Sequence, residues 1–310
     1  MAETIYNSTP ARDGFHMPAE FEPQERVWML WPQRPDNWRD GAKPAQEAYT
    51  EVAKAISRFV PVTMCVNGDQ YQNAREKLPS DIQVVEMSGN DAWMRDMGPA
   101  FVVNEEGLLR GCDWRFNAWG GFVDGLYFPW DKDDQIAGKV CEMIGADYYR
   151  LPDFVLEGGS FHVDDVACFV RPGEVACIYT EDESSPFYET AQQCYRELCG
   201  MTDAKERKLK VHRVCCPKEP VQIGDDFRID HMPGTIPREQ GELCIASYLN
   251  FLITNGAVIV PQYGDENDAL ALEQIQEIFP EREVIGVYTR EIVYGGGNIH
   301  CITMQQPKCR

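Results

Sequence analysis

A cysteine behind three consecutive glycines near the end of the chain is the first candidate for chemistry. The segment GGGNIHC places Cys301 after the glycines at 295–297. Glycines let a bound molecule approach the backbone closely, and a thiol beyond them could attack a carbon held there. The adjacent His300 would be a poor base, because neighbours on an expected strand point to opposite faces. A single cysteine is more often a small buried apolar residue, so Cys301 needs partners from elsewhere.

The segment FHVDD supplies an imidazole and a carboxylate at a usable spacing. His162 and Asp164 are two residues apart. On an extended strand both side chains would lie on one face, where the carboxylate could orient the imidazole. A histidine whose hydrogen bonds are satisfied near a turn explains the segment equally well. The remaining histidines outside the glycine-rich segments are weaker candidates: His16, His212 and His231.

An acidic and aromatic segment, NDAWMRDMGP, is the third candidate. It gathers Asp91, Arg95 and Asp96 around Trp93. Carboxylates hold a planar guanidinium through paired hydrogen bonds, and an aromatic face can lie beneath it. A loop held by salt bridges is the alternative explanation of the same residues.

A thiol, an imidazole and several carboxylates together indicate one class of substrate. Asp96, Glu157 and Asp164 would supply the acids. Nearby carboxylates normally raise the pKa of a thiol. A reactive Cys301 among them therefore requires a cationic substrate that offsets their charge. We expect guanidine chemistry, with a small cationic guanidine as the binding partner.

The acidic composition excludes two kinds of partner. The 310 residues include 50 Asp and Glu against 29 Lys and Arg, which gives a formal net charge of -21. Nucleic acids and anionic membranes require clustered basic residues, so neither is expected as a partner. Small cations would be attracted, although acidity that only keeps the protein soluble explains the charge equally well.

The location and the cofactor requirement are also predicted from the sequence. The first residues show no secretory signal, and no window reaches the roughly 18 apolar residues of a membrane span, so we expect a cytoplasmic protein. The 12 cysteines are irregularly spaced and the 5 histidines lack paired zinc spacing. We expect reduced thiols, no metal site and no organic cofactor.

Short strand-like runs alternate with amphipathic helices, which predicts a mixed α/β fold. Strand character is present at 61–67, 82–88, 99–103, 209–214 and 283–289, and is clearer still in the two apolar runs of YLNFLITNGAVIVPQ. Pro172-Gly173 and Asn255-Gly256 each lie between two apolar runs and predict hairpins. Helices are expected at 48–59, from Ser185 to Gly200, and at 269–279. No Gly/Ser-rich linker divides the chain, so we expect a single domain over 1–310.

The segments EGGSFHV and GGGNIHC, at 157–163 and 295–301, share a pattern of two glycines, a small polar residue, an apolar residue and a histidine. Two related structural units could present such strand ends toward a common centre. Chance similarity between short glycine-containing segments is the alternative.

A series of segments resembles the agmatine deiminase family of the guanidine-modifying superfamily, which also holds arginine deiminases and peptidyl-arginine deiminases. In chain order these include NDAWMRDMGPAFVV, DWRFNAWGG, LEGGSFHVD, CFVRPG, ASYLNFLITNGAVIVPQYGD and GGGNIHCITMQQP. The resemblance covers nearly the whole chain. It implies a pentein-like, five-fold pseudo-symmetric α/β propeller. It also implies hydrolysis of agmatine to N-carbamoylputrescine and ammonia, a step of putrescine biosynthesis and polyamine metabolism.

The same resemblance implies roles for individual residues. Cys301 matches the nucleophile that attacks the guanidinium carbon and forms an amidino-cysteine intermediate. His162, with Asp164, would protonate the leaving ammonia and then activate water. The substrate-binding residues implied are Asp96 on the guanidinium nitrogens, Trp93 as a wall of the pocket, and Glu157.

The chain departs from the family pattern at one place. In the family, the segment that LEGGSFHVD resembles and the one that HVDDVACFVRPG resembles are separated by a long stretch, whereas here they share HVD. Phe161 also replaces the usual glycine. The propeller should therefore lack part of one or two blades. Glu157 and His162, five residues apart, would lie on opposite faces of one strand, so both cannot keep their family positions.

Two other functions remain open at this point. The chain could be a catalytically inactive, truncated relative that retains partial binding or none. It could also be a deiminase acting on arginine or peptidyl-arginine. The sequence does not determine the oligomeric state, and a homodimer is compatible with it.

Overall fold

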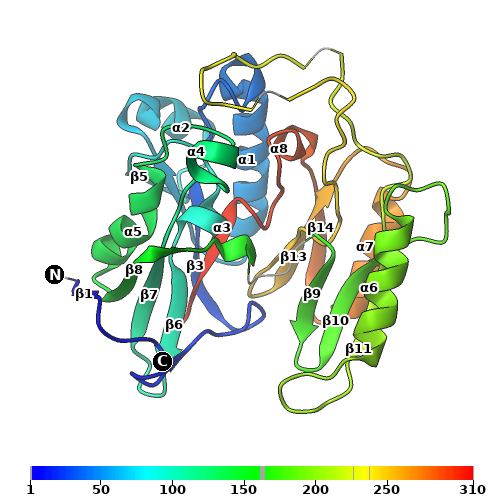
Figure 1. The fold of residues 1–310 in the computed structure, drawn as a ribbon, viewed down its shortest axis with the longest axis horizontal. Coiled ribbons are helices and arrows are strands. Elements are labelled where there is room, and N and C mark those ends of the chain that lie inside the picture. Colours follow the sequence, from blue (N-terminus) through cyan, green and yellow to red (C-terminus); the bar gives the residue numbers. More distant parts are fainter. Residues whose placement is uncertain (1, 161–164, 226, 237, 310) are drawn as a thin grey trace. The chain divides into compact units, whose positions relative to one another are not determined.

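A computed structural model describes residues 2–160, 165–225, 227–236 and 238–309. The chain forms two compact units, coloured along the sequence in Figure 1. Unit 1 comprises Met1–Phe161, Arg228–Pro237 and Cys301–Arg310, and unit 2 comprises His162–Phe227 and Arg238–His300. The single domain expected from the sequence stays a prediction.

The first sheet of unit 1 has five strands in the order β1, β8, β7, β6, β2. Strands β6 and β7 form an antiparallel hairpin, and β8 returns parallel to β7 after helix α5. Helix α5 packs on β7 through apolar residues such as Ile136, Val140 and Cys141. The bounds are β1 (Thr4–Ile5), β2 (Phe15–His16), β6 (Ala100–Asn104), β7 (Leu109–Arg115), α5 (Ile136–Ile144) and β8 (Tyr148–Val155).

The second sheet of unit 1 has the order β15, β3, β4, β5. The last strand of the chain, β15, is antiparallel to β3, and β4 follows parallel to β3 after helix α1. Proline in the first turn of α1 suits a position without a helical N–H partner. The bounds are β3 (Gln24–Leu30), α1 (Lys43–Ser57), β4 (Val62–Val66), α2 (Tyr71–Lys77), β5 (Gln83–Glu86) and β15 (Thr303–Pro307).

Unit 1 also contains short helical segments between its strands. The α-helical ones are α3 (Met94–Met97) and α4 (Gly121–Asp124). The 3-10 turns are η1 (Arg39–Ala42), η2 (Gly68–Gln70), η3 (Asp133–Gln135) and η4 (Gly158–Ser160). Two of these, α3 and η4, carry the candidate site.

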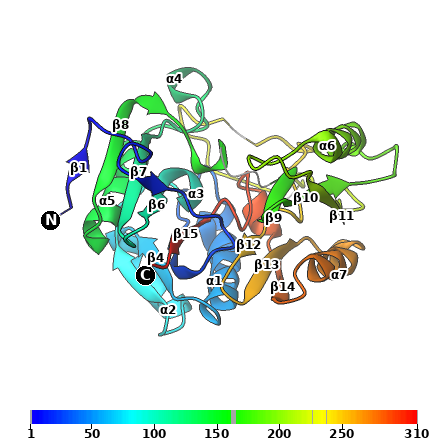
Figure 2. The same ribbon diagram turned by 90° about the horizontal axis from the view of Figure 1, so that it is seen from below.

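Unit 2 contains two three-stranded sheets, each with one antiparallel and one parallel pair. The predicted turns at Pro172-Gly173 and Asn255-Gly256 join β9 to β10 and β12 to β13, so both predicted hairpins are confirmed. Figure 1 shows α6 along β10 and β11, and Figure 2 shows α7 beside β14. The bounds are β9 (Ala167–Arg171), β10 (Glu174–Tyr179), α6 (Tyr188–Gly200), β11 (Lys210–Cys215), β12 (Leu252–Ile253), β13 (Ala257–Gln262), α7 (Asp268–Ile278), β14 (Glu283–Tyr288) and α8 (Arg290–Val293).

One arrangement recurs in both units: an antiparallel strand pair, a helix, and a strand parallel to the second of the pair. The described residues hold four such modules: β15-β3-α1-β4, β6-β7-α5-β8, β9-β10-α6-β11 and β12-β13-α7-β14. The predicted mixed α/β architecture is therefore confirmed. None of the described helices has the length and apolar character that a membrane span requires.

Candidate functional site

The acidic and aromatic segment forms a short helix rather than a loop. Trp93 immediately precedes α3 (Met94–Met97), and Gly98 leaves the helix before a proline that could not continue it. Arg95 is fully buried, and its guanidinium pairs with Glu20 at 3.2 Å. A salt bridge therefore exists, but its acid comes from outside the segment. The alternative explanation as a salt-bridged loop is wrong in its secondary structure.

Asp91 accepts hydrogen bonds from three side chains, including that of Trp93, the residue before α3. Its carboxylate accepts hydrogen bonds from Asn37 at 2.9 Å, from the Trp38 indole at 2.8 Å and from the Trp93 indole at 2.9 Å. Burial raises the pKa of Asp91 to about 6, although the indole hydrogen bonds and Arg34 lower it. Trp93 is 4% exposed and stacks on Trp38 with 5.3 Å between ring centroids. Asp91 thus fixes the orientation of the Trp93 ring.

Asp96 is oriented by two donors that come from different segments. Its Oδ1 accepts a hydrogen bond from the Gly159 backbone N–H at 2.8 Å, and its Oδ2 accepts one from the Trp119 indole at 3.0 Å. A carboxylate oxygen can accept more than one hydrogen bond, so these donors do not prevent Asp96 from binding a guanidinium. Asp96 is half-buried. Its carboxylate is therefore positioned before any substrate binds.

Trp119 is a site residue that the sequence reasoning missed. The backbone bends sharply at this point, since Ala118 and Trp119 have φ values of 55° and 61°. Two consecutive non-glycine residues in the left-handed region cost free energy and persist only where the surroundings impose them. The rings of Phe116 and Tyr127 pack edge-on against Trp119. A tryptophan before paired glycines, in the quoted DWRFNAWGG, was the available signal.

Glu157 does not lie on a strand, contrary to the expectation. Strand β8 ends at Val155, and Gly158–Ser160 form the 3-10 turn η4. The Ser160 hydroxyl donates to Glu157 Oε2 at 2.9 Å. A β-carbon on Gly158 would lie 2.1 Å from the backbone oxygen of Arg95, so only glycine allows this turn to lie against α3. The prediction that Glu157 lies on one strand with His162 is therefore wrong.

Cys301 is tied to the same short helix. Its backbone oxygen accepts a hydrogen bond from the Arg95 N–H at 3.0 Å. Residues 299–302 form a turn before β15, so the expectation that His300 and Cys301 alternate on a strand is wrong. Cys301 is half-buried. Burial raises the pKa of Tyr49 well above its usual value, and the charges of Asp91 and Cys301 raise it further, which puts Tyr49 near this thiol.

His162 and Asp164 lie outside the described residues. In unit 2, the residue that follows them is held by Asn250, whose side-chain N–H donates to Asp165 at 2.9 Å. Asn250 Oδ1 also accepts the backbone N–H of His300 at 2.9 Å. His300 itself is 2% exposed. Asn250, which sequence reasoning did not single out, thus joins the chain just after the predicted His-x-Asp to the residue before Cys301.

The described residues of the two glycine-rich segments form turns next to strands β8 and β15, and a structural relation between the two segments stays a prediction. Residues 158–160 form η4, and residues 294–296 form a turn. What the segments share is contact with α3, made by Gly158 and Gly159 in the first and by Cys301 in the second. Trp93, Asp96, Glu157 and Cys301 are thereby gathered around one short helix of unit 1.

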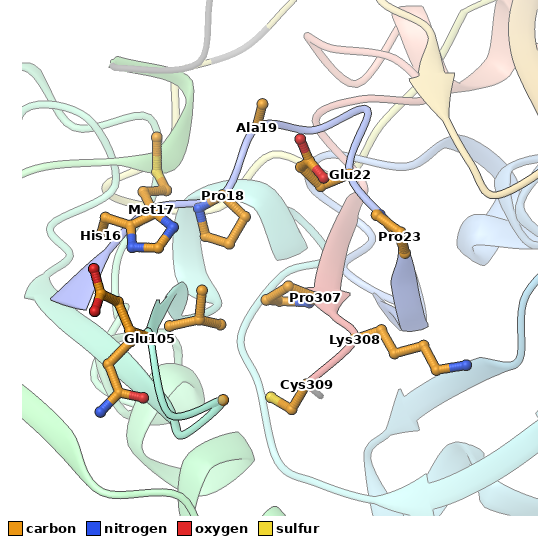
Figure 3. Close-up of a pocket in the computed structure, with 13 residues that line it drawn as sticks. His16, Met17, Pro18, Ala19, Glu22, Pro23, Glu105, Pro307, Lys308 and Cys309 are labelled. Atoms are coloured by element: carbon orange, nitrogen blue, oxygen red, sulfur yellow. The ribbon is translucent and has the colours of Figure 1, made fainter.

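A groove of unit 1 is lined by a different set of residues. In unit 1, a groove of about 960 Å³ runs between His16–Pro23, Val103–Gly107 and Pro307–Cys309, with residues from the first and last segments facing each other in Figure 3. The weaker candidate His16 lines it, whereas Trp93, Asp96, Glu157 and Cys301 do not. Among the described residues, no group of three or more His, Cys, Asp or Glu side chains could hold a metal ion. That no cofactor is needed stays a prediction.

Comparison with known proteins gives consistent results. A family model for Porphyromonas-type peptidyl-arginine deiminase matches residues 16–165 and 160–307. A candidate agmatine deiminase of Lactococcus lactis subsp. lactis is 58% identical over 366 aligned positions that cover 100% of both chains. The agmatine deiminase of Pseudomonas aeruginosa is 45% identical, with 98% of each chain covered. A solved structure of the agmatine deiminase of Enterococcus faecalis has 56% identity and a TM-score of 0.97, and covers 99% of this chain and 100% of its own.

These comparisons also locate a missing stretch. The two segments matched by the family model overlap at residues 160–165. The alignment with the Lactococcus relative spans 366 positions, whereas this chain has 310 residues, so at least 56 positions have no residue here. The overlap contains the shared HVD letters, which confirms that two family segments are fused at this point.

Proposed function

This chain belongs to the agmatine deiminases of the Porphyromonas-type peptidyl-arginine deiminase family, and on that premise we propose that it hydrolyses agmatine to N-carbamoylputrescine and ammonia. Cys301 acts as the nucleophile, and Asp96 binds the guanidinium. The reaction would supply the precursor of putrescine. We further propose that it takes place in the cytoplasm.

This proposal rests on the connection of both Cys301 and Asp96 to α3. The Arg95 N–H holds the backbone of Cys301, and Asp96 is the next residue on the helix. Gly159 and Trp119 orient the Asp96 carboxylate. A guanidinium bound to Asp96 places a cation beside the thiol, which favours the thiolate form that attacks. Trp93, which immediately precedes α3, and Glu157, which immediately precedes η4, would complete the substrate-binding surface.

The chemical steps require an acid and a base in addition to the thiol. The Cys301 sulfur forms a bond to the guanidinium carbon, and the C–N bond to one terminal nitrogen breaks as that nitrogen takes a proton and leaves as ammonia. Water then adds to the same carbon and the C–S bond breaks, which releases N-carbamoylputrescine. We assign both proton transfers to His162, oriented by Asp164. The Asn250 hydrogen bonds to Asp165 and His300 support this assignment, because they connect the residue after Asp164 to the residue before Cys301.

The proposal also concerns the number of structural modules in the fold. Relatives have at least 56 further positions, and the module β6-β7-α5-β8, at residues 100–155, spans a comparable length. We propose that the family fold is a five-module propeller, that this chain has four of the modules in a single domain, and that the missing module would follow β8. Loss of that module removes part of the substrate pocket.

Ammonia release from agmatine by the purified chain tests the proposed function. We expect turnover that is lost in Cys301→Ser, together with weaker or no turnover of free arginine and peptidyl-arginine. Turnover that survives Cys301→Ser would contradict the role of the thiol. Faster turnover of arginine or peptidyl-arginine would favour the alternative substrates.

A second candidate function is that of an inactive relative that still binds agmatine. The fusion of the two family segments favours it. The departure falls at the residues assigned to proton transfer, whereas the contacts around α3 are intact. Calorimetric titration separates the two candidates. Agmatine binding that Asp96→Asn abolishes, without ammonia release, would establish the inactive binder.

A further inference from the structure

A pair of thiols lies between α6 and β10 in unit 2. Cys177 on β10 is fully buried and belongs to an apolar cluster with Val175 and Leu209. Helix α6 covers this cluster with Cys194, Tyr195 and Leu198, whose spacing places them on one helical face. Cys194 therefore lies on the face that α6 presents to β10.

Cys194 packs against the buried cluster that contains Cys177. Burial raises the pKa of Cys177, and among the neighbouring groups the Cys194 thiol raises it most, ahead of Cys216 and Cys199. The described cysteines offer no set of three metal ligands, so a metal site does not explain the cluster. No disulfide joins Cys177 to Cys194 in this structure. The geometry is thus that of two reduced thiols near each other across a helix–sheet interface.

We propose that Cys177 and Cys194 form a disulfide when the protein meets a hydroperoxide, and that this bond fastens α6 to the sheet of unit 2. Cys194 is half-buried and reacts first: an S–O bond forms, the O–O bond breaks, and water leaves from hydrogen peroxide. The sulfur of Cys177 then attacks Cys194, forming the S–S bond, and the hydroxyl leaves as a second water. Two thiols are oxidised and one peroxide is reduced.

The order of these steps follows from the surroundings of the two thiols. Burial and the Cys194 thiol raise the pKa of Cys177 well above its usual value, so Cys177 stays protonated and shielded from the oxidant. Cys194 on the helix surface is reached more easily. Cys177 can then react with oxidised Cys194, because the two sulfurs are already neighbours.

Helix α6 is the element that such a bond would affect. It has 13 residues, of which only Ala191 is fully buried, whereas the 11-residue α7 buries three. A disulfide stabilises a protein because it restricts the unfolded chain between the two cysteines. A helix with few buried residues would gain the most stability from such a link to its sheet. We expect oxidation to raise the thermal midpoint of unfolding by on the order of 5 °C.

Peptide mapping of the full chain after hydrogen peroxide treatment tests the proposal. A glutamate-specific protease separates the two cysteines, since it releases residues 175–181 with Cys177 and residues 190–197 with Cys194. We expect these two peptides to be linked under non-reducing conditions and to separate on reduction. Cys199 lies in the next peptide, at 198–206, so a wrong pairing is distinguishable.

Two variants complete the test. Cys194→Ser should abolish both the linked peptide and the rise in thermal midpoint, whereas Cys199→Ser, a change on the same helix, should preserve both. Oxidation that stops at sulfinic acid on Cys194, or that links Cys177 to Cys199 or Cys216, would overturn the proposal. Because the readouts are a mass and a midpoint, they are independent of agmatine turnover.

Discussion

The two glycine-rich segments contact the same short helix in opposite ways. Gly159 donates its backbone N–H to the Asp96 side chain, whereas Cys301 accepts the Arg95 backbone N–H at its carbonyl. The second segment runs directly into β15, which pairs with β3. The first runs into residues 161–164, where relatives have at least 56 more positions. The missing positions therefore leave in place the contacts of Gly159 and Cys301 with α3. They fall at the residues that we assign to proton transfer.

Asp96→Asn removes the charge from the shared helix and should have the largest effect. The variant would keep the size of the side chain but could not neutralise a guanidinium, so we expect kcat/KM for agmatine to fall about 100- to 1000-fold. Steady-state ammonia release measures the loss. The matched control is Asp131→Asn, an exposed acid elsewhere in unit 1, which should retain activity. Equal losses in both variants would contradict a specific role for Asp96.

Gly158→Ala tests the contact made by the first segment. The added β-carbon would meet the Arg95 backbone oxygen at 2.1 Å, so the turn must move away from α3. We expect the free energy of unfolding to fall by about 2 to 3 kcal/mol. Urea denaturation checks this value. Gly200→Ala, where no atom lies within 4 Å of the added carbon, is the control and should leave stability nearly unchanged.

Trp119→Phe sharpens the comparison by removing one hydrogen-bond donor to Asp96 and leaving the Gly159 N–H in place. The ring remains, but the indole N–H that bonds Oδ2 at 3.0 Å is lost. Such a hydrogen bond to a charged group contributes about 1.5 to 3 kcal/mol. We expect KM for agmatine to rise about 10-fold with a smaller change in kcat. Trp130→Phe, in the aromatic cluster with Phe122 and Phe128, should leave KM unchanged.

A pH dependence of stability should come from the buried acid behind α3. Burial raises the pKa of Asp133 to about 7, against a usual value of 3.8. Between these values the folded protein holds a proton that the unfolded chain releases, so this contribution is full below about pH 4 and is lost as pH rises through about 7. Relative to Asp133→Asn, the wild type should lose about 1 kcal/mol per pH unit between pH 5 and 6.5. Denaturation at both pH values measures the difference, and parallel curves would contradict it.

Regular elements were predictable because their patterns are local. The apolar spacing at 48–59 and 269–279 gave α1 and α7, and the Asn255-Gly256 pair gave the β12–β13 hairpin. The site was harder to predict, because glycines permit several turns. The glycine-rich segments were expected as strand ends, but their described residues include turns at 158–160 and 294–296.

The long-range hydrogen bonds of the site leave no periodic signal in the sequence. Trp119 bonds to Asp96 over 23 positions, and Asn250 bonds to Asp165 over 85. Candidate residues could be named from their chemistry and from the family resemblance. Which of them contact the same helix, and which residues support them, became clear only from the three-dimensional structure.

Intact-mass measurement after rapid acid quenching of a mixture of the protein with agmatine tests the role of Cys301 most directly. We predict a mass increase equal to agmatine less ammonia, located on the peptide that contains Cys301 and lacking in Cys301→Ser. The same mass increase in Cys301→Ser, or ammonia release by the wild type with no adduct on Cys301 at any quench time, would contradict nucleophilic attack by this thiol.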